Sequence, residues 1–341
     1  TFQAIKWTGS TLELLDQRCL PHTETYLEFS DAPAVATAIR DMVVRGAPAI
    51  GITAAYAVVL SAQQHRAASG GDWRERLQQD IERLAAARPT AVNLVWALQR
   101  MRRCLAAAGD APVGTLLDEA KRIHQADIDA NVCMGGFGAG LINRGDSVLT
   151  YCNTGSLATG GYGTALGVVR SAWAAGKLNR VFAGETRPWQ QGSRLTCWEL
   201  AQDHIPVTLL VDSAMGQLFR RERPQWLIVG ADRVAANGDV ANKIGTRALA
   251  VAARYQGVGV MVAAPTSTID MDTPEGAAIP IEERDADELL ACGTRRIGAD
   301  GASVWNPVFD ITPSELIDAL VTEKGVVLQP NAKKLSELME S

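Results

Sequence analysis

Residues 148–167 read VLTYCNTGSLATGGYGTALG, and they are the most informative part of the chain. The segment begins with apolar and β-branched residues, which predict a short strand ending at Cys152 and Asn153. A glycine-rich loop follows, and a helix is expected to begin near Thr164. Open α/β sheets bind their ligands at such strand ends, and glycines let backbone N–H groups approach an anion closely. The segment therefore predicts an enzyme or a nucleotide-binding protein.

The residues after this segment alternate between short apolar runs and helical patterns. Strands are predicted at 148–152, 180–184, 207–211, 226–230, 258–264 and 325–328. Helices are predicted between them at 164–175, 193–203, 214–222 and 243–255. Apolar strands that alternate with helices are typical of a parallel sheet with helices on both faces. The fold class is therefore α/β, whereas residues 265–310 are polar and irregular and are left unassigned.

The first residues of the chain predict a different architecture. Three segments of alternating polarity predict a hairpin with a third strand: 2–7, 12–15 and 26–29. Ser30 or Asp31 is expected to cap a helix that runs to about Val44. This part of the chain is therefore expected to begin with a small antiparallel sheet.

A change of pattern along the chain predicts two domains. Residues 47–108 are helical in pattern, with a break before Thr90, which is the expected cap of the next helix. A long helix at about 113–142 links the two parts. Residues 1–125 are expected to form a smaller, mostly helical domain with the antiparallel sheet, and residues 126–341 to form the domain built on the parallel sheet.

Composition excludes several classes of protein. The chain has 341 residues, of which 47% are hydrophobic and 21% charged, as in ordinary soluble proteins. A net charge of -5 without a basic tract argues against a nucleic-acid partner, and no apolar run reaches the ~18 residues of a membrane span. Six scattered cysteines and the lack of a signal-peptide pattern favour the reducing cytoplasm. The four histidines lack metal-ligand spacing, so no metal is expected.

Polar residues follow four of the predicted strands, and in this architecture such strand ends line one crevice. They are Cys152-Asn153, Glu185-Thr186-Arg187, Asp212-Ser213 and Asp232-Arg233. A thiol or carboxylate among apolar groups can act as a general acid or base. The position of Cys152 before a glycine-rich loop favours a functional thiol over a buried apolar one. For Asp232, spacing alone leaves a site residue equally open with a helix cap or a partner of Arg233.

Basic and amide residues at predicted helix starts indicate a bound phosphate, because free N–H groups at a helix N-terminus attract anions. They are Arg45-Gly46-Ala47, Arg88, Gln191 and Asn242-Lys243, the last of which is expected to open the helix at 243–255. Each cation is weak evidence alone, since most lysines and arginines are solvated. Together these residues favour a phosphorylated small molecule as the ligand.

A dinucleotide-dependent dehydrogenase is the competing class of enzyme. The pattern Gly161-x-Gly163-x-x-x-Gly167 is similar to a phosphate-binding fingerprint, and Glu185 follows where an acidic residue would contact a ribose hydroxyl. The first of these glycines lies nine residues beyond Cys152, which is too far for the tight turn of that fingerprint. Sugar-phosphate chemistry is therefore preferred, with the dehydrogenase second and a non-catalytic binding module third.

Six blocks, in order along the chain, resemble the successive signatures of the S-methyl-5-thioribose-1-phosphate isomerase family. They are RGAPAIG at 45–51, RPTAVNL at 88–94, CNTGSLAT at 152–159, ETRPWQQGSRL at 185–195, GADRVAANGDV at 230–240 and NKIGT at 242–246. The resemblance covers nearly the whole chain. It implies an aldose–ketose isomerase of methionine salvage that converts 5-methylthioribose 1-phosphate to 5-methylthioribulose 1-phosphate. It further implies a Rossmann-like catalytic domain, a cytoplasmic homodimer and no cofactor.

The resemblance also assigns roles to ten residues. The family's catalytic cysteine and aspartate match Cys152 and Asp232, and its substrate-binding positions match Arg45, Gly46, Ala47, Arg88, Asn153, Gln191, Asn242 and Lys243. Relatives with this fold include regulatory subunits of a translation-initiation exchange factor, which lack the catalytic pair, and ribose-1,5-bisphosphate isomerases, which keep it. The pair favours an enzyme but leaves related pentose phosphates open as substrates. Thr154 and Gly160, where relatives often carry alanine, also leave related pentose phosphates open as substrates.

Overall fold

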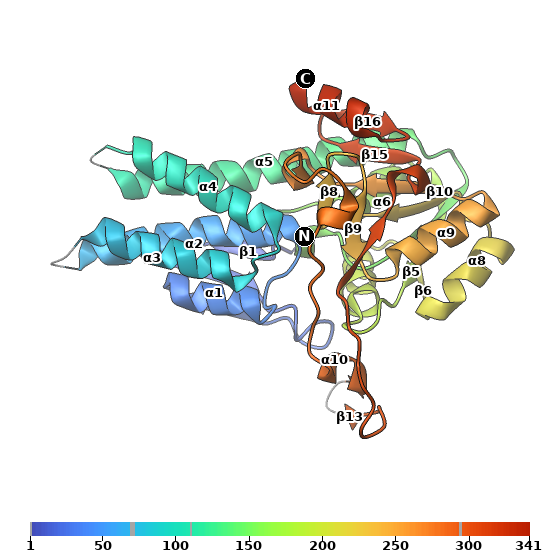
Figure 1. Ribbon diagram of the computed structural model, residues 1–341, viewed down its shortest axis with the longest axis horizontal. Coiled ribbons are helices and arrows are strands. Elements are labelled where there is room, and N and C mark those ends of the chain that lie inside the picture. The colour runs from blue at the N-terminus through green and yellow to red at the C-terminus, as the bar shows by residue number, and fades with distance from the viewer. Residues whose placement is uncertain (1, 69–71, 110, 293–294) are drawn as a thin grey trace.

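The computed structural model describes residues 2–68, 72–109, 111–292 and 295–341, and Figure 1 shows its layout. Its largest sheet has seven strands in the order β16-β15-β10-β7-β4-β5-β6. They are β4 (Asp146–Thr150), β5 (Leu178–Gly184), β6 (Val207–Leu210), β7 (Trp226–Val229), β10 (Gly259–Ala263), β15 (Ala319–Thr322) and β16 (Gly325–Leu328). All neighbours are parallel except β15 and β16. The predicted α/β class with a parallel sheet is confirmed, and β15 is an additional strand.

Helices pack on both faces of this sheet, because successive residues of a strand point to opposite sides. Leu227 and Val229 of β7 belong to the hydrophobic cluster on one face, and Ile228 belongs to the cluster on the other. The first cluster includes residues of α8 (Met215–Arg221), α9 (Thr246–Gln256) and α11 (Ala332–Glu340). The second includes residues of α6 (Ala165–Ala174) and α7 (Cys197–Gln202). Burial on both faces explains why the central strands β7 and β10 are apolar throughout.

A second sheet of four short strands, in the order β11-β8-β9-β14, is absent from the sequence prediction. Its strands are β8 (Arg233–Ala235), β9 (Val240–Lys243), β11 (Ile269–Asp270) and β14 (Phe309–Thr312). The prediction that Asn242 and Lys243 open a helix is wrong, because both lie on β9, and α9 begins only at Thr246. The unassigned segment 265–310 supplies β11, the beginning of β14, and an extension with α10 (Asp287–Leu290), β12 (Ala291–Cys292) and β13 (Arg295–Arg296) (Figure 1).

The first part of the chain forms a three-stranded antiparallel sheet and long helices that extend to one side of the molecule (Figure 1). Strands β1 (Ile5–Trp7), β2 (Leu12–Leu15) and β3 (Tyr26–Phe29) confirm the predicted hairpin and third strand. The helices are α1 (Ala32–Arg40), α2 (Ala47–Ala67), α3 (Trp73–Ala87), α4 (Val92–Ala107) and α5 (Pro112–Gly140). Helix α2 is buried on all sides as far as Ala62, so the other helices pack around it.

Two predicted helix boundaries in this part are wrong, and one is confirmed. Asp31 caps α1, since its carboxylate accepts a hydrogen bond from the N–H of Ala34 at 2.8 Å. Helix α1 ends at Arg40 instead of about Val44, because Met42 adopts a φ of 59°, which is incompatible with a right-handed helix. Thr90 does not cap α4. Its hydroxyl donates instead to the distant Glu282 at 3.4 Å.

Helix α5 takes part in two hydrophobic cores. Its residues Leu116 and Ile123 belong to the core of the N-terminal helices, whereas Met134 and Ala139 belong to a core of the large sheet. Gly138 permits close contact with α6, since a Cβ at this position would lie 2.4 Å from Val168. Among the described residues, no helix is both long and apolar enough to cross a membrane.

Candidate active site

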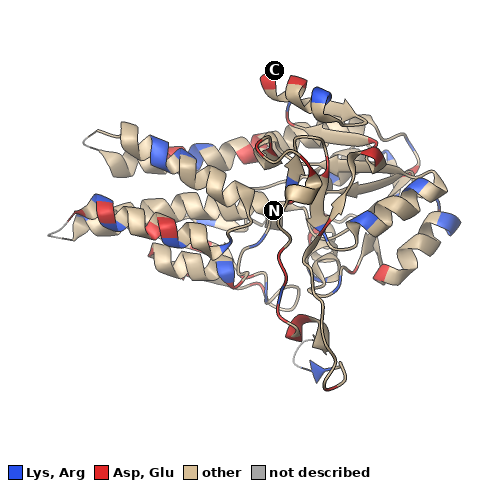
Figure 2. Ribbon diagram, viewed as in Figure 1, with Lys and Arg blue, Asp and Glu red and all other residues tan. Residues whose placement is uncertain are grey.

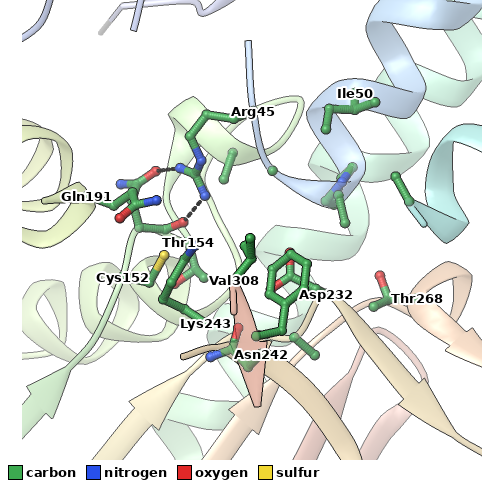
Figure 3. Close-up of a pocket in the computed structure, with 18 of the residues that line it drawn as sticks. Arg45, Ile50, Cys152, Thr154, Gln191, Asp232, Asn242, Lys243, Thr268 and Val308 are labelled. Atoms are coloured by element: carbon green, nitrogen blue, oxygen red, sulfur yellow. Dashed lines mark hydrogen bonds between the residues drawn. The ribbon is translucent and has the colours of Figure 1, made fainter. Parts of the chain in front are cut away.

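One pocket brings together all ten residues to which the sequence assigns a catalytic or binding role. They are Arg45, Gly46, Ala47, Arg88, Cys152, Asn153, Gln191, Asp232, Asn242 and Lys243. The pocket lies at the carboxyl ends of β4 and β7 and at the start of α2, and β9 and β14 contribute further lining (Figure 3). These side chains therefore share one space, although they come from distant parts of the chain.

The strand order explains why the pocket forms at β4 and β7. The chain passes from β4 through β5 to β6 on one side of the sheet and then returns to β7 on the other side of β4. A crevice opens at such a switch point, and open α/β sheets bind ligands there. The predicted polar residues that follow β5 and β6, and Arg233, do not line the pocket, contrary to the prediction of one common crevice. Arg233 pairs with Asp270 at 3.2 Å, and Asp212 accepts hydrogen bonds from two backbone N–H groups.

Cys152 occupies an unusual backbone conformation at the end of β4. Its φ is 62°, in the left-handed region that non-glycine residues rarely adopt and that clusters at functional sites. The residue is only 5% exposed, and Figure 3 shows it beside Lys243, with Asp232 at another side of the pocket. The bend that ends the strand therefore leaves a thiol on the wall of the pocket.

Arg45 is held in place by the glycine-rich loop. Its guanidinium donates to the side-chain oxygen of Asn153 at 2.7 Å and to the main-chain oxygen of the same residue at 2.8 Å (Figure 3). The Asn153 amide donates in turn to the fully buried Glu199 at 2.9 Å, and Glu199 forms an ion pair with Arg170 at 2.9 Å. Glu199 also accepts two backbone N–H groups of the loop. Arg45 is thus oriented before any ligand arrives.

Two glycines are required for this arrangement. Gly46, at the start of α2, has a φ of 102°, and a Cβ there would lie 2.5 Å from the main-chain oxygen of Ala158. A Cβ on Gly155 would lie 2.2 Å from a carboxylate oxygen of Glu199. Since real Cβ atoms do not approach other atoms so closely, both positions depend on glycine.

Positive charges dominate the electrostatics around Asp232. Burial raises the pKa of the Asp232 carboxyl, and the charges of Lys243, Arg45 and two further arginines partly oppose that rise. Burial lowers the pKa of the Lys243 ammonium, and Cys152 and Asp232 oppose that change. A carboxyl with a raised pKa retains a proton at a higher pH than usual, as a general acid requires.

Arg284 is a cation of the pocket that the sequence analysis misses. It comes from the irregular segment 265–310 and forms ion pairs with Glu282 at 3.1 Å and Glu288 at 3.6 Å. Glu282 also pairs with Arg88 at 3.0 Å. The pairs of Arg284 are local, but its place in the pocket and the pairing of Glu282 with the distant Arg88 have no sequence signal, because only the tertiary fold brings these segments together. Within the described ranges, no three His, Cys, Asp or Glu side chains are grouped so that they could hold a metal ion.

Helix α5 anchors the far end of the glycine-rich loop. Asp127 accepts hydrogen bonds from the N–H of Gly160 at 2.7 Å and the amide of Asn131 at 2.9 Å. The His124 ring donates to the carbonyl of Gly160 at 2.9 Å, and its other nitrogen lies 3.2 Å from the Tyr56 hydroxyl. Burial raises the pKa of Asp127 from 3.8 to about 6, although its hydrogen bonds act in the opposite direction.

Replacement of Asp127 by asparagine should stabilise the fold at pH 8 and not at pH 4. Because its pKa is raised in the folded state, the stability that protonated Asp127 contributes is present below pH 3.8 and lost as the pH rises through about 6. The difference between 3.8 and about 6 corresponds to at most roughly 3 kcal/mol. Asparagine keeps an oxygen for the N–H of Gly160 and carries no charge.

Urea unfolding of Asp127→Asn and of the unaltered protein at pH 4 and pH 8 measures this effect. Asp129→Asn is the matched control, since Asp129 lies on the same helix and is exposed. A loss of stability in Asp127→Asn that is equal at both pH values would contradict the expectation.

Comparisons with known proteins show which family this chain is similar to. The model of the initiation factor 2 subunit family matches residues 43–329. A methylthioribose-1-phosphate isomerase of Thioalkalivibrio sulfidiphilus is 58% identical over 340 residues, which are 100% of this chain and 97% of the relative.

Two solved structures are similar to this chain over nearly their whole length. The crystal structure of 5-methylthioribose 1-phosphate isomerase from Pyrococcus horikoshii OT3 has a TM-score of 0.92 and 39% identity, with 100% of this chain and 96% of the other covered. A structure named translation initiation factor eIF-2B, subunit delta, from A. fulgidus has a TM-score of 0.86 and 41% identity, with 99% and 100% covered. The chain therefore belongs to the initiation factor 2 subunit family and, within it, to the methylthioribose-1-phosphate isomerases.

Proposed function

We propose that this chain converts 5-methylthioribose 1-phosphate to 5-methylthioribulose 1-phosphate, an aldose-to-ketose step of methionine salvage. The observation that carries the proposal is that Cys152 and Asp232 line one pocket together with several cations. Arginine and lysine are suitable ligands for the phosphate. The buried oxygens of Thr154 and Gln191 have no hydrogen-bond partner within the described structure and are available to sugar hydroxyls.

The reaction moves a hydrogen from C2 to C1 of the sugar and breaks the bond between C1 and the ring oxygen. Asp232 in its acid form gives a proton to the ring oxygen, while the Cys152 thiolate removes the proton from C2. The product of this step is an enol phosphate with a C1–C2 double bond. The thiol then returns its proton to C1, and the Asp232 carboxylate takes the proton of the 2-hydroxyl. The ketone forms, and both residues regain their starting states.

A hydride shift from C2 to C1 is the other possible route, and isotope labels distinguish the two. Reaction in deuterium oxide should place solvent deuterium at C1 of the product if the enol forms. Full retention of a deuterium label from C2 would instead require the hydride shift, and Cys152 would lose its assigned role as base.

A proton NMR assay of the purified chain with 5-methylthioribose 1-phosphate, without added metal or nucleotide, tests the proposed function. Conversion to the 1-phosphoketose supports it. Turnover of 5-deoxyribose 1-phosphate or ribose 1,5-bisphosphate instead would keep the chemistry and change the substrate. No turnover of any of the three would favour a non-catalytic binding role; the A. fulgidus relative is named a translation initiation factor subunit.

Arg45→Ala should raise KM by roughly 10- to 100-fold, in keeping with the loss of charge-assisted hydrogen bonds to phosphate. Arg88→Ala should raise KM less, because Glu282 already pairs with Arg88, whereas no carboxylate pairs with Arg45 among the described residues. Steady-state kinetics measure both effects. Arg40→Ala, which removes an exposed arginine of α1, serves as the control. An unchanged KM in Arg45→Ala would remove Arg45 from the phosphate site.

Several finer properties belong to the same proposal. Residues 1–125 and 126–341 are proposed as two domains, the second Rossmann-like, linked by the helix predicted at about 113–142. The two parts of α5 pack in different cores, which supports this division.

The protein is proposed to be a cytoplasmic homodimer without cofactor or nucleic-acid partner, in line with its family and its net charge of -5. Sedimentation of the purified chain tests the homodimer.

A further inference from the structure

The position of the Cys152 thiol in the pocket depends on the main chain of the same residue. Among the described residues its sulfur has no hydrogen-bond partner, so no side-chain contact of this kind fixes the thiol. The backbone of Cys152 nevertheless has a φ of 62°, which an L-residue leaves unless neighbouring groups hold it. The groups that bind the main chain of Cys152 therefore determine where its sulfur lies.

Two threonine hydroxyls bind this main chain from either side. The N–H of Cys152 donates to the hydroxyl of Thr186 at 2.9 Å, and the hydroxyl of Thr196 donates to the carbonyl of Cys152 at 2.6 Å. Both threonines are fully buried. The Thr186 hydroxyl donates its own proton to the carbonyl of Gly184 at 3.1 Å, which leaves a lone pair to accept from Cys152. The hydroxyl of Thr186 therefore has a fixed direction.

The strand at the edge of the sheet holds Thr186 in turn. Thr186 itself has a φ of 66°, and its N–H donates to one carboxylate oxygen of Asp212 at 2.7 Å. The other oxygen accepts the N–H of Arg187 at 2.6 Å. A continuous chain of hydrogen bonds thus runs from Asp212 beyond β6, through Thr186 beyond β5, to Cys152 beyond β4. This series of hydrogen bonds gives a role to strand-end residues that lie outside the pocket.

We infer that Thr186 is a positioning residue for Cys152, supported by Asp212 and paired with Thr196 on the other side. Its hydroxyl holds the left-handed main chain of Cys152 so that the thiol lies on the pocket wall within reach of the same ligand as Asp232. The consequence for catalysis rests on the proposed function, whereas the position of the thiol does not. Thr186 does not line the pocket but binds Cys152, which does, so we expect its hydroxyl to affect the reaction through Cys152.

Thr186→Val tests this inference, because valine has the shape of threonine but cannot accept the Cys152 N–H. We expect kcat to fall at least 10-fold with KM within a factor of about three, since the ligand contacts remain. Thr186→Ser should restore most of kcat, since it keeps the hydroxyl. Thr150→Val is the matched control. Thr150 is also buried, lies two residues before Cys152, and has a hydroxyl without a partner in the described structure, so the same substitution breaks no hydrogen bond there.

Alkylation by iodoacetamide, followed at each cysteine by peptide mass spectrometry, gives a readout that needs no substrate. A released Cys152 should react at least threefold faster in Thr186→Val, while the exposed Cys19 and Cys133 keep their rates as internal references. Asp212→Asn should shift the Cys152 rate in the same direction by a smaller factor, and it replaces Thr186→Val if that variant does not fold.

The outcomes separate the two proposals. Equal kcat and equal Cys152 alkylation in Thr186→Val and Thr150→Val would overturn the positioning role. If Thr186→Val does not fold, the comparison is between Asp212→Asn and the unaltered protein. Equal Cys152 alkylation in those two proteins would then overturn the positioning role. An unaltered protein that turns over no sugar phosphate would overturn the proposed function, while the alkylation rates would still decide the positioning role.

Discussion

Cys152→Ser should lower kcat by roughly 10²- to 10⁴-fold and leave KM within a factor of about three. Serine has nearly the same size as cysteine and suits the same backbone, so the ligand contacts of the pocket remain. Its hydroxyl is a far weaker acid than a thiol, so an anion that could remove the C2 proton is hardly populated. Initial rates from the NMR assay over a range of substrate concentrations measure both constants.

Cys197→Ser is the matched control for this substitution. Cys197 begins α7, lies outside the pocket, and has a pKa raised by burial to about 11, so it is not a base near neutral pH. The control should keep the kcat of the unaltered protein. A Cys152→Ser variant with near-normal kcat would return Cys152 to the role of a small buried side chain.

Asp232→Asn should reduce kcat by a similar factor, roughly 10²- to 10⁴-fold. An amide has the size of the carboxyl but gives no proton to the ring oxygen, so the bond between C1 and that oxygen must break without acid assistance. The pKa of Asp232 is raised and its starting state is the neutral acid, so a neutral amide keeps the charge of that state, and phosphate binding should be retained. Calorimetric titration with inorganic phosphate measures that second effect.

Asp272→Asn provides the control, because Asp272 is exposed and outside the pocket. If Asp232→Asn kept its turnover and lost its affinity for phosphate, Asp232 would have a structural role instead. Loss of turnover with retained affinity is the result that the acid role requires.

Local sequence patterns predict the large sheet, and the candidate site residues that they single out line one pocket. The central strands β7 and β10 are buried on both faces, so each appears as an apolar run, and Cys152 and Asp232 follow within three residues of the ends of β4 and β7. Cys152 and Asp232 stand at those ends, and Gly46 precedes a helix. The locations of these residues depend on neighbours in the sequence, and that is why they can be predicted.

The β8–β9 hairpin shows where such prediction fails. Lys243 lines the pocket as predicted, but it lies on a strand where a helix is predicted. The error arises because β8 and β9 are only three and four residues long. Asn237-Gly238 in the turn was the available signal, since this dipeptide favours tight hairpin turns. Arg284 and the pairing of Glu282 with Arg88 carry no such signal. Only the tertiary fold brings Arg284 into the pocket and Glu282 against Arg88.

The contact between Gly155 and Glu199 limits how sequences of this kind can diverge. A side chain at position 155 would overlap the carboxylate that organises the loop, and loss of the carboxylate would leave Arg170 buried without that partner. Neither position can change first without a cost in fitness, so substitutions at the two sites are expected to arise together during evolution. A relative in which only one of the two positions has changed is therefore expected to have lost the fixed orientation of Arg45.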